Sequence, residues 1–469
     1  MKEIAIGSRG LKSFELAQAI KAGELSACEV TQAQMARIEQ TNSTLNTFIG
    51  KSYERALSEA RAIDALRARG GVLPPLAGVP YAVKNLFDVE GEVTLAGSCV
   101  NRSHAPATQD AFLVTRMKSA GAVMLGSLNM DEYAYGFTTE NTHYGPTRNP
   151  HDVTRTAGGS SGGSGAAVAA GQVGVSLGSD TNGSIRVPAS LCGVWGIKPT
   201  FGRLSRRGTF PFVHSIDHLG PFADCVESLA LVYDALQSPD ALDPGCHALS
   251  VQAVGPLTQG VAGLRIGVLG GYFHTLASLP AREAVQVAAK ALGATDQVTW
   301  PDAELARAAA FITTATEGAS LHLDNLRTRA DEFEPLSVDR FLAGALTPAS
   351  WYVRAQRFRR LYRDRVNALF QDWDVLLAPA TPVCAPPIGA DWIDINGTQH
   401  PARPALGLLT QPISFAGCPV VAAPLWPSGT AGLPIGVQII AAPWREDLAF
   451  RAALALQNAG VAYLTPVEF

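Results

Sequence analysis

The chain has 469 residues, of which 47% are hydrophobic and 17% charged, which excludes an intrinsically disordered protein and supplies apolar side chains for a large core. Its 45 glycines and 30 prolines follow no short period, which excludes a collagen-like chain, and a net charge of −4 without a basic stripe argues against direct binding to nucleic acid or an anionic membrane. No apolar stretch reaches the ~18 residues of a membrane span, and the opening MKEIAIGSRG lacks the apolar core of a secretory signal. The seven cysteines form no CxxC pair. We therefore expect a cytoplasmic protein with reduced thiols.

The first part of the chain has the pattern of helices. Ser26 and Glu29 form a capping-box pair, which predicts a helix through residues 30–38. Apolar residues at helical spacing predict a second helix over 51–69 that ends at Gly70-Gly71. We therefore expect an N-terminal helical region of about residues 1–70.

From residue 76 onwards, short β-type runs alternate with helical ones. The pattern predicts strands over 76–87, 123–125, 173–177, 263–269, 374–378, 420–423 and 435–440. It predicts helices over 110–120, 226–236, 281–292, 351–370 and 448–459, and mostly helical structure over 301–345. This interleaving predicts an α/β fold in which a single large mixed β-sheet is covered by helices, with one domain over residues 1–469.

The segment GGSSGGSG at 158–165 is the most unusual in the chain, and three interpretations compete. A phosphate-binding P-loop requires a lysine after the glycines, which is absent here. The nucleophile elbow GxSxG is matched at 158–162, but the preceding HDVTRTA is too polar for the buried strand that this motif requires. The third interpretation is a loop of close backbone approach, whose serines act together with residues from elsewhere in the chain.

Two further residues favour the third interpretation. Ser184 follows a Thr-Asn-Gly turn after the predicted strand 173–177, where a serine is well placed as a nucleophile beside N–H groups that can stabilise an oxyanion. The alternative is an ordinary glycine-rich turn. Lys84 lies in a mostly apolar run, residues 79–87. If its side chain is buried, its pKa is lowered, and the neutral amine could take a proton from a serine. The alternative is a lysine at the edge of the sheet whose amine extends into water.

These segments together resemble the amidase signature family. The family pattern is a lysine in a GxPxxxK strand, then a GGSSGG loop, then a D-x-x-G-S-[IV]-R segment, and the three stand here at 78–84, 158–163 and 180–186 with the family's spacing. Other stretches that resemble the family are NMDEYAYGFTTENTHYGPTRNP at 129–150, LCGVWGIKPTFGRLS at 191–205, SIDHLGPFA at 215–223 and GLPIGVQII at 432–440. The resemblance therefore extends over nearly the whole chain.

The resemblance implies a role for individual residues. Ser184 would be the nucleophile that forms an acyl-enzyme, Ser160 the bridging serine that follows a cis peptide bond, and Lys84 the general base. It implies that no metal, histidine or organic cofactor is needed. The oxyanion hole would consist of the backbone N–H groups of Thr181, Asn182, Gly183 and Ser184.

The resemblance leaves two activities open. One is glutamine hydrolysis by the amidase subunit of a tRNA-dependent amidotransferase. The other is release of ammonia from a small urea-like linear amide such as 1-carboxybiuret or biuret, and more of the matching stretches favour this activity. Arg359 would bind a substrate carboxylate, or would cover a helix face, and Gly407 stands where the glutamine enzymes carry an aspartate for the α-amine. A carboxylate clamp without an ammonium partner favours an anionic urea-like substrate. Tyr135 is a further candidate for substrate contact, or a core aromatic residue.

The resemblance also implies a small helical partner subunit, and we expect the catalytic chain to form a homodimer. His214, Asp217 and His218 have the i, i+3, i+4 spacing of metal ligands, but without a third anchored ligand we interpret them as structural. A catalytically inactive scaffold protein is the alternative from a different functional class, and the presence of all three residues of the family pattern argues against it.

Overall fold

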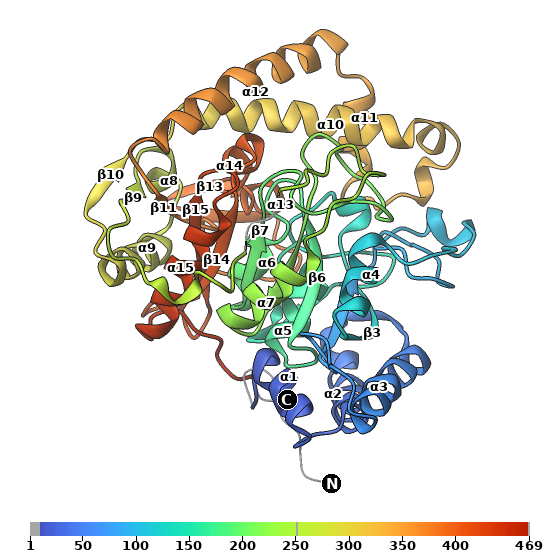
Figure 1. The fold of residues 1–469 in the computed structure, drawn as a ribbon. Coiled ribbons are helices and arrows are strands. Elements are labelled where there is room, and N and C mark those ends of the chain that lie inside the picture. The colour runs from blue at the N-terminus through green and yellow to red at the C-terminus, as the bar shows by residue number, and fades with distance from the viewer. Residues whose placement is uncertain (1–9, 250–251, 468–469) are drawn as a thin grey trace.

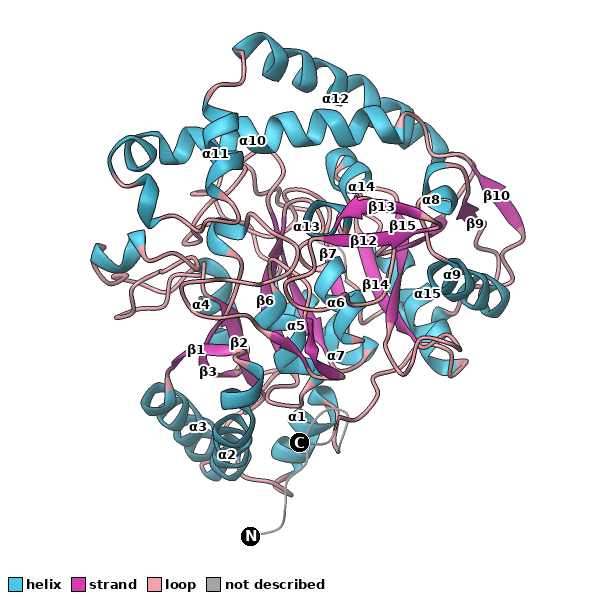
Figure 2. Cartoon of the chain, turned by 180° about the vertical axis from the view of Figure 1, so that it is seen from behind, coloured by secondary structure: helices cyan, strands magenta, loops and turns pink. Residues whose placement is uncertain are grey.

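A mixed β-sheet of eleven strands runs through the middle of the protein (Figures 1 and 2). The structure, a computed structural model, describes residues 10–249 and 252–467. In spatial order the strands are β1 (Phe48–Lys51), β3 (Val123–Leu128), β2 (Pro80–Lys84), β6 (Val175–Asp180), β8 (His218–Ala223), β7 (Trp195–Lys198), β14 (Val420–Leu425), β15 (Ile435–Ala441), β11 (Val375–Pro379), β9 (Ile266–Leu269) and β10 (Asp296–Val298). Strands β3, β2 and β6 are parallel, as are β11, β9 and β10, and the strands between these two sets pair antiparallel.

Helices surround this sheet. They are α1 (Ser13–Ala22), α2 (Ala27–Leu45), α3 (Tyr53–Ala68), α4 (Phe112–Ser119), α5 (Gly162–Ala169), α6 (Arg186–Cys192), α7 (Val226–Leu236), α8 (Tyr272–Thr275), α9 (Leu279–Leu292), α10 (Ala303–Thr328), α11 (Val338–Ala345), α12 (Ala349–Leu369), α13 (Ala402–Ala405), α14 (Gln411–Ala416) and α15 (Glu446–Asn458). Helices α2 and α3 lie together at one end of the molecule, and α10 and α12 lie side by side across the opposite end (Figures 1 and 2). Two hairpins, β4 (Arg148–Asn149) with β5 (Asp152–Thr156) and β12 (Trp392–Ile395) with β13 (Thr398–Pro401), stand outside the sheet.

The central strands are buried along their whole length. Every residue of β2, β6, β14 and β15 is buried. A sheet that is covered on both faces selects continuous apolar runs rather than alternation, because neither face of the strand meets water. The predicted fold class, an α/β protein with one large mixed sheet covered by helices, is confirmed.

The boundaries of individual elements agree unevenly with the sequence patterns. Helix α7 has the predicted bounds, and α2 begins with the predicted capping box, in which the Ser26 hydroxyl accepts the N–H of Glu29 at 3.4 Å. Of the strand predicted over 76–87, only residues 80–84 form a strand, β2, so the prediction is wrong at both ends. The predicted helical stretch 301–345 is interrupted between α10 and α11, and the N-terminal helical region also contains β1. The first nine residues, which carry part of the expectation about a secretory signal, lie outside the described residues.

Two expectations from composition can be compared directly with the structure. Within residues 10–249 and 252–467, none of the helices combines the length and the apolar character that crossing a membrane requires. All seven cysteines are free thiols, as the scattered spacing predicted.

Candidate active site

Lys84 is the last residue of β2 and has no exposed surface. Its Nζ donates hydrogen bonds to Ser160 Oγ at 2.6 Å and to Ser179 Oγ at 2.9 Å. Ser179 lies near the end of β6, which pairs in parallel with β2, so the two strands deliver the amine and one hydroxyl to the same edge of the sheet. The sequence pattern identified Lys84 and Ser160 as candidates, whereas Ser179 was missed.

Burial changes the acidity of this lysine. Removal of the amine from water lowers the pKa of Lys84 to about 7, although the negative charges of Asp131, Asp180 and Asp217 raise it in part. A large fraction of the lysine is therefore neutral near pH 7. A neutral amine within 2.6 Å of a serine hydroxyl can accept a proton from it.

Ser160 stands in the glycine-rich loop that leads into α5, and the Gly159–Ser160 peptide bond is cis. Its carbonyl oxygen accepts the backbone N–H of Asp131 at 3.2 Å. A Cβ atom on Gly159 would lie 2.1 Å from Asp131 Oδ2, and one on Gly158 would lie 2.9 Å from Pro188 Cα in α6. The two glycines therefore allow the loop to lie directly against neighbouring backbone, where a side chain has no room.

Ser184 lies in the turn between β6 and α6 and is 2% exposed. Its hydroxyl makes no hydrogen bond with any residue in the described part of the chain. The turn is held by Asp180, whose carboxylate accepts the N–H of Gly183 at 2.7 Å and pairs with Arg186 Nε at 3.0 Å. Burial alone would raise the pKa of Asp180, but the Arg186 guanidinium outweighs it and holds that pKa well below its usual range.

The four expected oxyanion donors are not equivalent in this turn. The N–H of Gly183 is directed to the Asp180 carboxylate. The backbone N–H groups of Thr181, Asn182 and Ser184 have no acceptor among the described residues, so they can bind an oxygen of a ligand. Gly183 itself has φ 140°, and a Cβ atom there would lie 2.2 Å from Thr410 Oγ1, which explains why this position is glycine.

Ser184 opens into a cleft. The cleft is formed by the 134–137 segment, the turn between β6 and α6, Phe212 and helices α10, α11, α13 and α14; its lining residues are Ala134, Tyr135, Gly136, Phe137, Thr181, Asn182, Ser184, Phe212, Arg307, Phe311, Thr314, Arg340, Pro404 and Gln411. Two of these residues are arginines and none is an aspartate or glutamate. The cleft beside the candidate nucleophile is therefore positively charged.

The two arginines are held in place by neutral partners. Arg340 Nη2 donates to the carbonyl oxygen of Tyr135 at 2.7 Å, and its guanidinium lies 4.2 Å from the centre of the Tyr135 ring. Arg307 Nε donates to Gln411 Oε1 at 3.2 Å. Because neither arginine pairs with an acidic side chain in the described residues, both charges are available to an anion in the cleft.

The two substrate contacts expected from the sequence lie in different places. Tyr135 lines the cleft, and its buried hydroxyl has no hydrogen-bond partner among the described residues. Arg359 does not line the cleft: it is buried on α12, its Nε donates to the carbonyl oxygen of Phe415 at 3.0 Å, and its guanidinium lies over the Phe415 and Phe201 rings. Sequence reasoning missed Arg340 and Arg307, because neither stands in a local motif.

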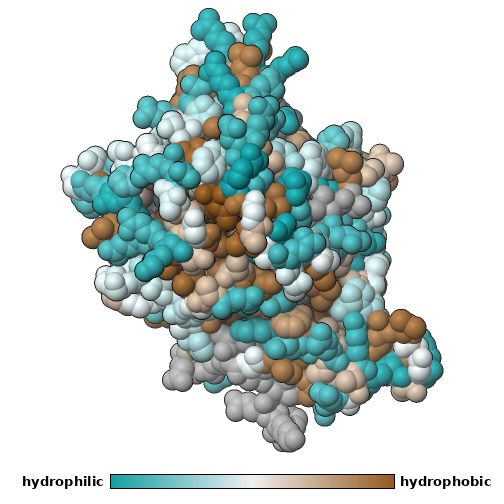
Figure 3. Space-filling view, turned by 60° about the vertical axis from the view of Figure 1, so that its left-hand side comes forward, coloured by the Kyte–Doolittle hydropathy of each residue, from teal (hydrophilic) through white to brown (hydrophobic). Residues whose placement is uncertain are grey.

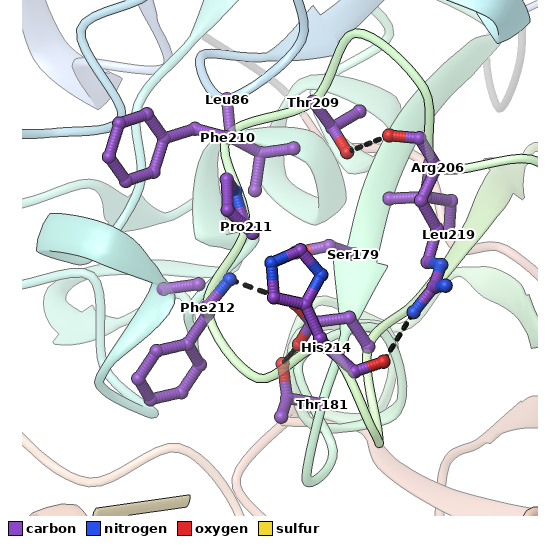
Figure 4. A pocket seen from close by; sticks show the side chains of 12 residues that line it. Leu86, Ser179, Thr181, Arg206, Thr209, Phe210, Pro211, Phe212, His214 and Leu219 are labelled. Carbon is purple, nitrogen blue, oxygen red and sulfur yellow. Dashed lines mark hydrogen bonds between the residues drawn. The ribbon is translucent and has the colours of Figure 1, made fainter. Parts of the chain in front are cut away.

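A second pocket adjoins the cleft and shares Ala134, Thr181 and Phe212 with it. Figure 4 shows this pocket with the side chains of Phe212, His214 and Ser179 around it. Ser179, the second hydroxyl partner of Lys84, therefore borders a separate cavity. Asp217 also lines it and accepts the Thr181 hydroxyl at 2.6 Å, which positions the oxyanion turn.

Two of the three possible metal ligands, Asp217 and His218, have other partners. Asp217 accepts the backbone N–H groups of Phe212 and Val213, each at 2.8 Å, and the ring of His218 is 3.1 Å from the carbonyl oxygen of Asp180. Within the described ranges, no group of three or more histidine, cysteine, aspartate or glutamate side chains is arranged to hold a metal ion.

Known proteins resemble this chain over nearly its whole length. The amidase family model matches residues 29–450. The chain is 68% identical over 455 residues to AtzE, a 1-carboxybiuret hydrolase subunit of Pseudomonas sp. (strain ADP), covering 97% of this chain and all of that protein. It is 38% identical over 478 residues to a glutamyl-tRNA(Gln) amidotransferase subunit of Moorella thermoacetica, covering 96% of each.

A solved structure shares the whole fold. An s-triazine catabolic enzyme, described as an inhibitor-bound form of a vestigial protein complex, superposes with a TM-score of 0.96 at 67% identity and covers 97% of this chain and all of its own. The family match and these two levels of identity extend over nearly every element of the fold. The chain therefore belongs to the amidase signature family, enzymes that hydrolyse the C–N bonds of amides.

Proposed function

We propose that this enzyme releases ammonia in the cytoplasm from a small urea-like linear amide, either the anionic 1-carboxybiuret or the related, neutral biuret. The observation that carries the proposal is the cleft at Ser184, which contains two arginines and no acidic side chain among its lining residues. A negatively charged substrate is attracted to such a site and a cationic one is repelled. The 68% identity to a 1-carboxybiuret hydrolase subunit supports this substrate class, and the free thiols are typical of a reducing compartment.

In the mechanism we propose, neutral Lys84 takes the proton of Ser160 while Ser160 takes the proton of Ser184. The Ser184 oxygen attacks the terminal carbonyl carbon, and the proton returns along the same path to the leaving nitrogen, so that ammonia departs and an acyl-enzyme remains. Water then attacks the acyl-enzyme and releases a carboxylic acid and Ser184. The Lys84–Ser160 bond of 2.6 Å supports the first step.

The oxyanion formed by each attack would bind the free backbone N–H groups of the turn at Thr181, Asn182 and Ser184. Gly183 was expected as a fourth donor, and its N–H instead keeps the turn in shape through Asp180. Donors that are already oriented need no rearrangement when charge develops on the oxygen. For 1-carboxybiuret the products would be ammonia and urea-1,3-dicarboxylate.

We assign the carboxylate clamp to Arg340 and Arg307 in place of Arg359. Both line the cleft with Ser184. In contrast, Arg359 Nε donates to the carbonyl oxygen of Phe415, and the Arg359 guanidinium lies over the Phe201 ring. A bidentate arginine–carboxylate pair fixes the orientation of a small substrate as well as its charge.

Glutamine is less well supported as a substrate. An α-amine needs an acidic partner, and the lining of the cleft contains none among the described residues. A Cβ atom on Gly407 would lie 2.3 Å from the ring of Phe137, so the position that carries an aspartate in the glutamine enzymes has no room for a side chain here. Nothing in the cleft favours the inactive scaffold, since Lys84, Ser160 and Ser184 are all present.

We also propose that the chain forms a dimer and binds a small helical partner subunit. The description of the related s-triazine enzyme as a protein complex supports this. Large apolar side chains are exposed on α10 and α12: Leu305, Phe311, Leu321, Leu323, Trp351, Val353 and Leu361. Apolar residues also gather in the middle of the face drawn in Figure 3, bordered by hydrophilic ones. Exposed apolar groups of this kind are typical of interfaces.

Ser184→Ala should lower the rate of ammonia release from 1-carboxybiuret by at least about 10⁴-fold, because no other group can form the acyl-enzyme. The rate is measured by ammonia assay, and circular dichroism of the variant controls for folding. A folded variant with near-normal turnover would contradict the assignment of the nucleophile.

Lys84→Met should raise the free energy of unfolding, and the gain should depend on pH. Lys84 has a pKa of about 7 when folded and of about 10.5 when exposed by unfolding. Below pH 7 the folded state must hold a desolvated charge, and this cost disappears as the pH rises from 7 to 10.5. Denaturant titrations should therefore show the largest gain near about pH 6 and almost none near pH 10.5. A gain that does not vary with pH would show that the buried lysine is not the titrating group.

Arg340→Gln should lower kcat/KM for 1-carboxybiuret by about tenfold or more while changing that for biuret much less, because only the first substrate has a carboxylate to bind. Arg359→Gln is the matched control, and it should affect the two substrates alike. Equal losses on both substrates in Arg340→Gln would reject the clamp, and a selective loss in Arg359→Gln would restore the original prediction.

The native mass of the enzyme, purified from its own cells and measured by light scattering, should exceed that of two 49.3 kDa chains because of the partner subunit. Mass spectrometry of the same sample should find one small second polypeptide. A single 49.3 kDa species at working concentration contradicts the assembly.

A further inference from the structure

Asn182 occupies an unusual position in the oxyanion turn. Its backbone N–H is one of the free donors, and its side chain lines the cleft beside Ser184. The family pattern D-x-x-G-S leaves this position open, so the choice of asparagine is not explained by the turn.

The side chain of Asn182 is held at one end only. Its Nδ2 donates to Thr314 Oγ1 in α10 at 2.8 Å, and its backbone carbonyl accepts the Thr410 hydroxyl at 2.6 Å. The residue is 6% exposed, and its Oδ1 is buried without a hydrogen-bond partner among the described residues. A buried carbonyl oxygen that lacks a donor costs about 1–3 kcal/mol, so a fold keeps one where a ligand supplies the missing donor.

The geometry points to Asn182 Oδ1 as the acceptor for the N–H group that adjoins the scissile carbonyl of a urea-like substrate. This inference rests on the proposed function, because a ureido substrate has such an N–H and a simple carboxamide has a CH₂ group in its place. The anchor at Thr314 and the pinned backbone fix the direction of the oxygen before the substrate arrives.

The consequence is that the enzyme distinguishes substrates by the group that adjoins the scissile carbonyl. A substrate with CH₂ in place of N–H leaves Oδ1 buried and without a donor, so it is rejected even when its size and charge are the same. Asn182 would therefore select ureido compounds among small anionic amides, while the arginines of the cleft select their charge.

Binding of two probes, allophanate and malonamate, tests this inference. Each carries one carboxylate and one terminal carboxamide, and the two differ only in N–H against CH₂. Dissociation constants are measured by calorimetry in the Ser184→Ala enzyme, where no turnover occurs, so the result does not depend on the chemical step.

In Ser184→Ala, allophanate should bind at least about tenfold more tightly than malonamate. Adding Asn182→Ala should bring the ratio close to one. Adding Asn182→Asp, which keeps an acceptor oxygen, should retain the preference even if both ligands bind less tightly, since its charge affects both alike. Adding Thr313→Ala should leave the ratio unchanged, because this neighbour of Thr314 has a buried hydroxyl but does not line the cleft.

Equal binding of the two probes in Ser184→Ala, or a ratio that survives Asn182→Ala, overturns the inference while the proposed function stands. Absence of allophanate binding, with or without binding of malonamate, also overturns it. If the wild-type enzyme releases no ammonia from 1-carboxybiuret or biuret, the proposed function fails, and that result is obtained separately from the binding ratio.

Discussion

The active site depends on one buried amine that has only hydroxyl groups as hydrogen-bond partners among the described residues. Lys84 contacts Ser160 and Ser179, and no carboxylate in that part of the chain accepts a hydrogen bond from it. A direct carboxylate partner would keep the lysine protonated, and full exposure would do the same. A neutral amine near pH 7 therefore requires both a dry position and the exclusion of acidic side chains from direct contact.

The fold meets this requirement although three aspartates lie close enough to influence the lysine. Asp180 pairs with Arg186, and Asp217 accepts the Thr181 hydroxyl. Asp131 accepts the backbone N–H of Thr139 at 3.0 Å. Each carboxylate is thus directed to other donors, which limits its effect on Lys84 to charge at a distance. The same three acids organise the loop at Ser160 and the turn at Ser184, so that one set of contacts influences the charge of Lys84 and positions the two serines.

The substrate cleft is assembled around this core from segments that are far apart in the chain. Arg340 comes from α11, Arg307 from α10 and Asn182 from the oxyanion turn, while Phe137 closes the position at Gly407. In the proposed function the catalytic groups are those of a general amide hydrolase, and the choice of substrate is left to the other residues that line the cleft. A change of substrate within this fold would then need no change in Lys84, Ser160 or Ser184.

Much of the fold could be predicted from patterns in the sequence, because they report burial. The runs that became β14 and β15 are almost entirely apolar since both faces of the sheet are covered, whereas β6 was recognised from apolar residues that alternate with small ones. The capping box predicted the start of α2. Strands β7 and β8 were not predicted, because β7 has only four residues and both strands are defined by their antiparallel pairing with each other and with β14 or β6.

For the site, the sequence by itself indicated the candidate residues that stand in contiguous motifs: Lys84, Ser160, Ser184 and the glycines that let backbone approach backbone. It could not determine which N–H groups of the turn remain free, because that depends on where the Asp180 carboxylate points. It pointed to Arg359 as the carboxylate ligand and missed Arg340, which stands in no local motif. Only the packing of α10, α11 and α12 decided that one guanidinium lies over Phe415 and the other lines the cleft.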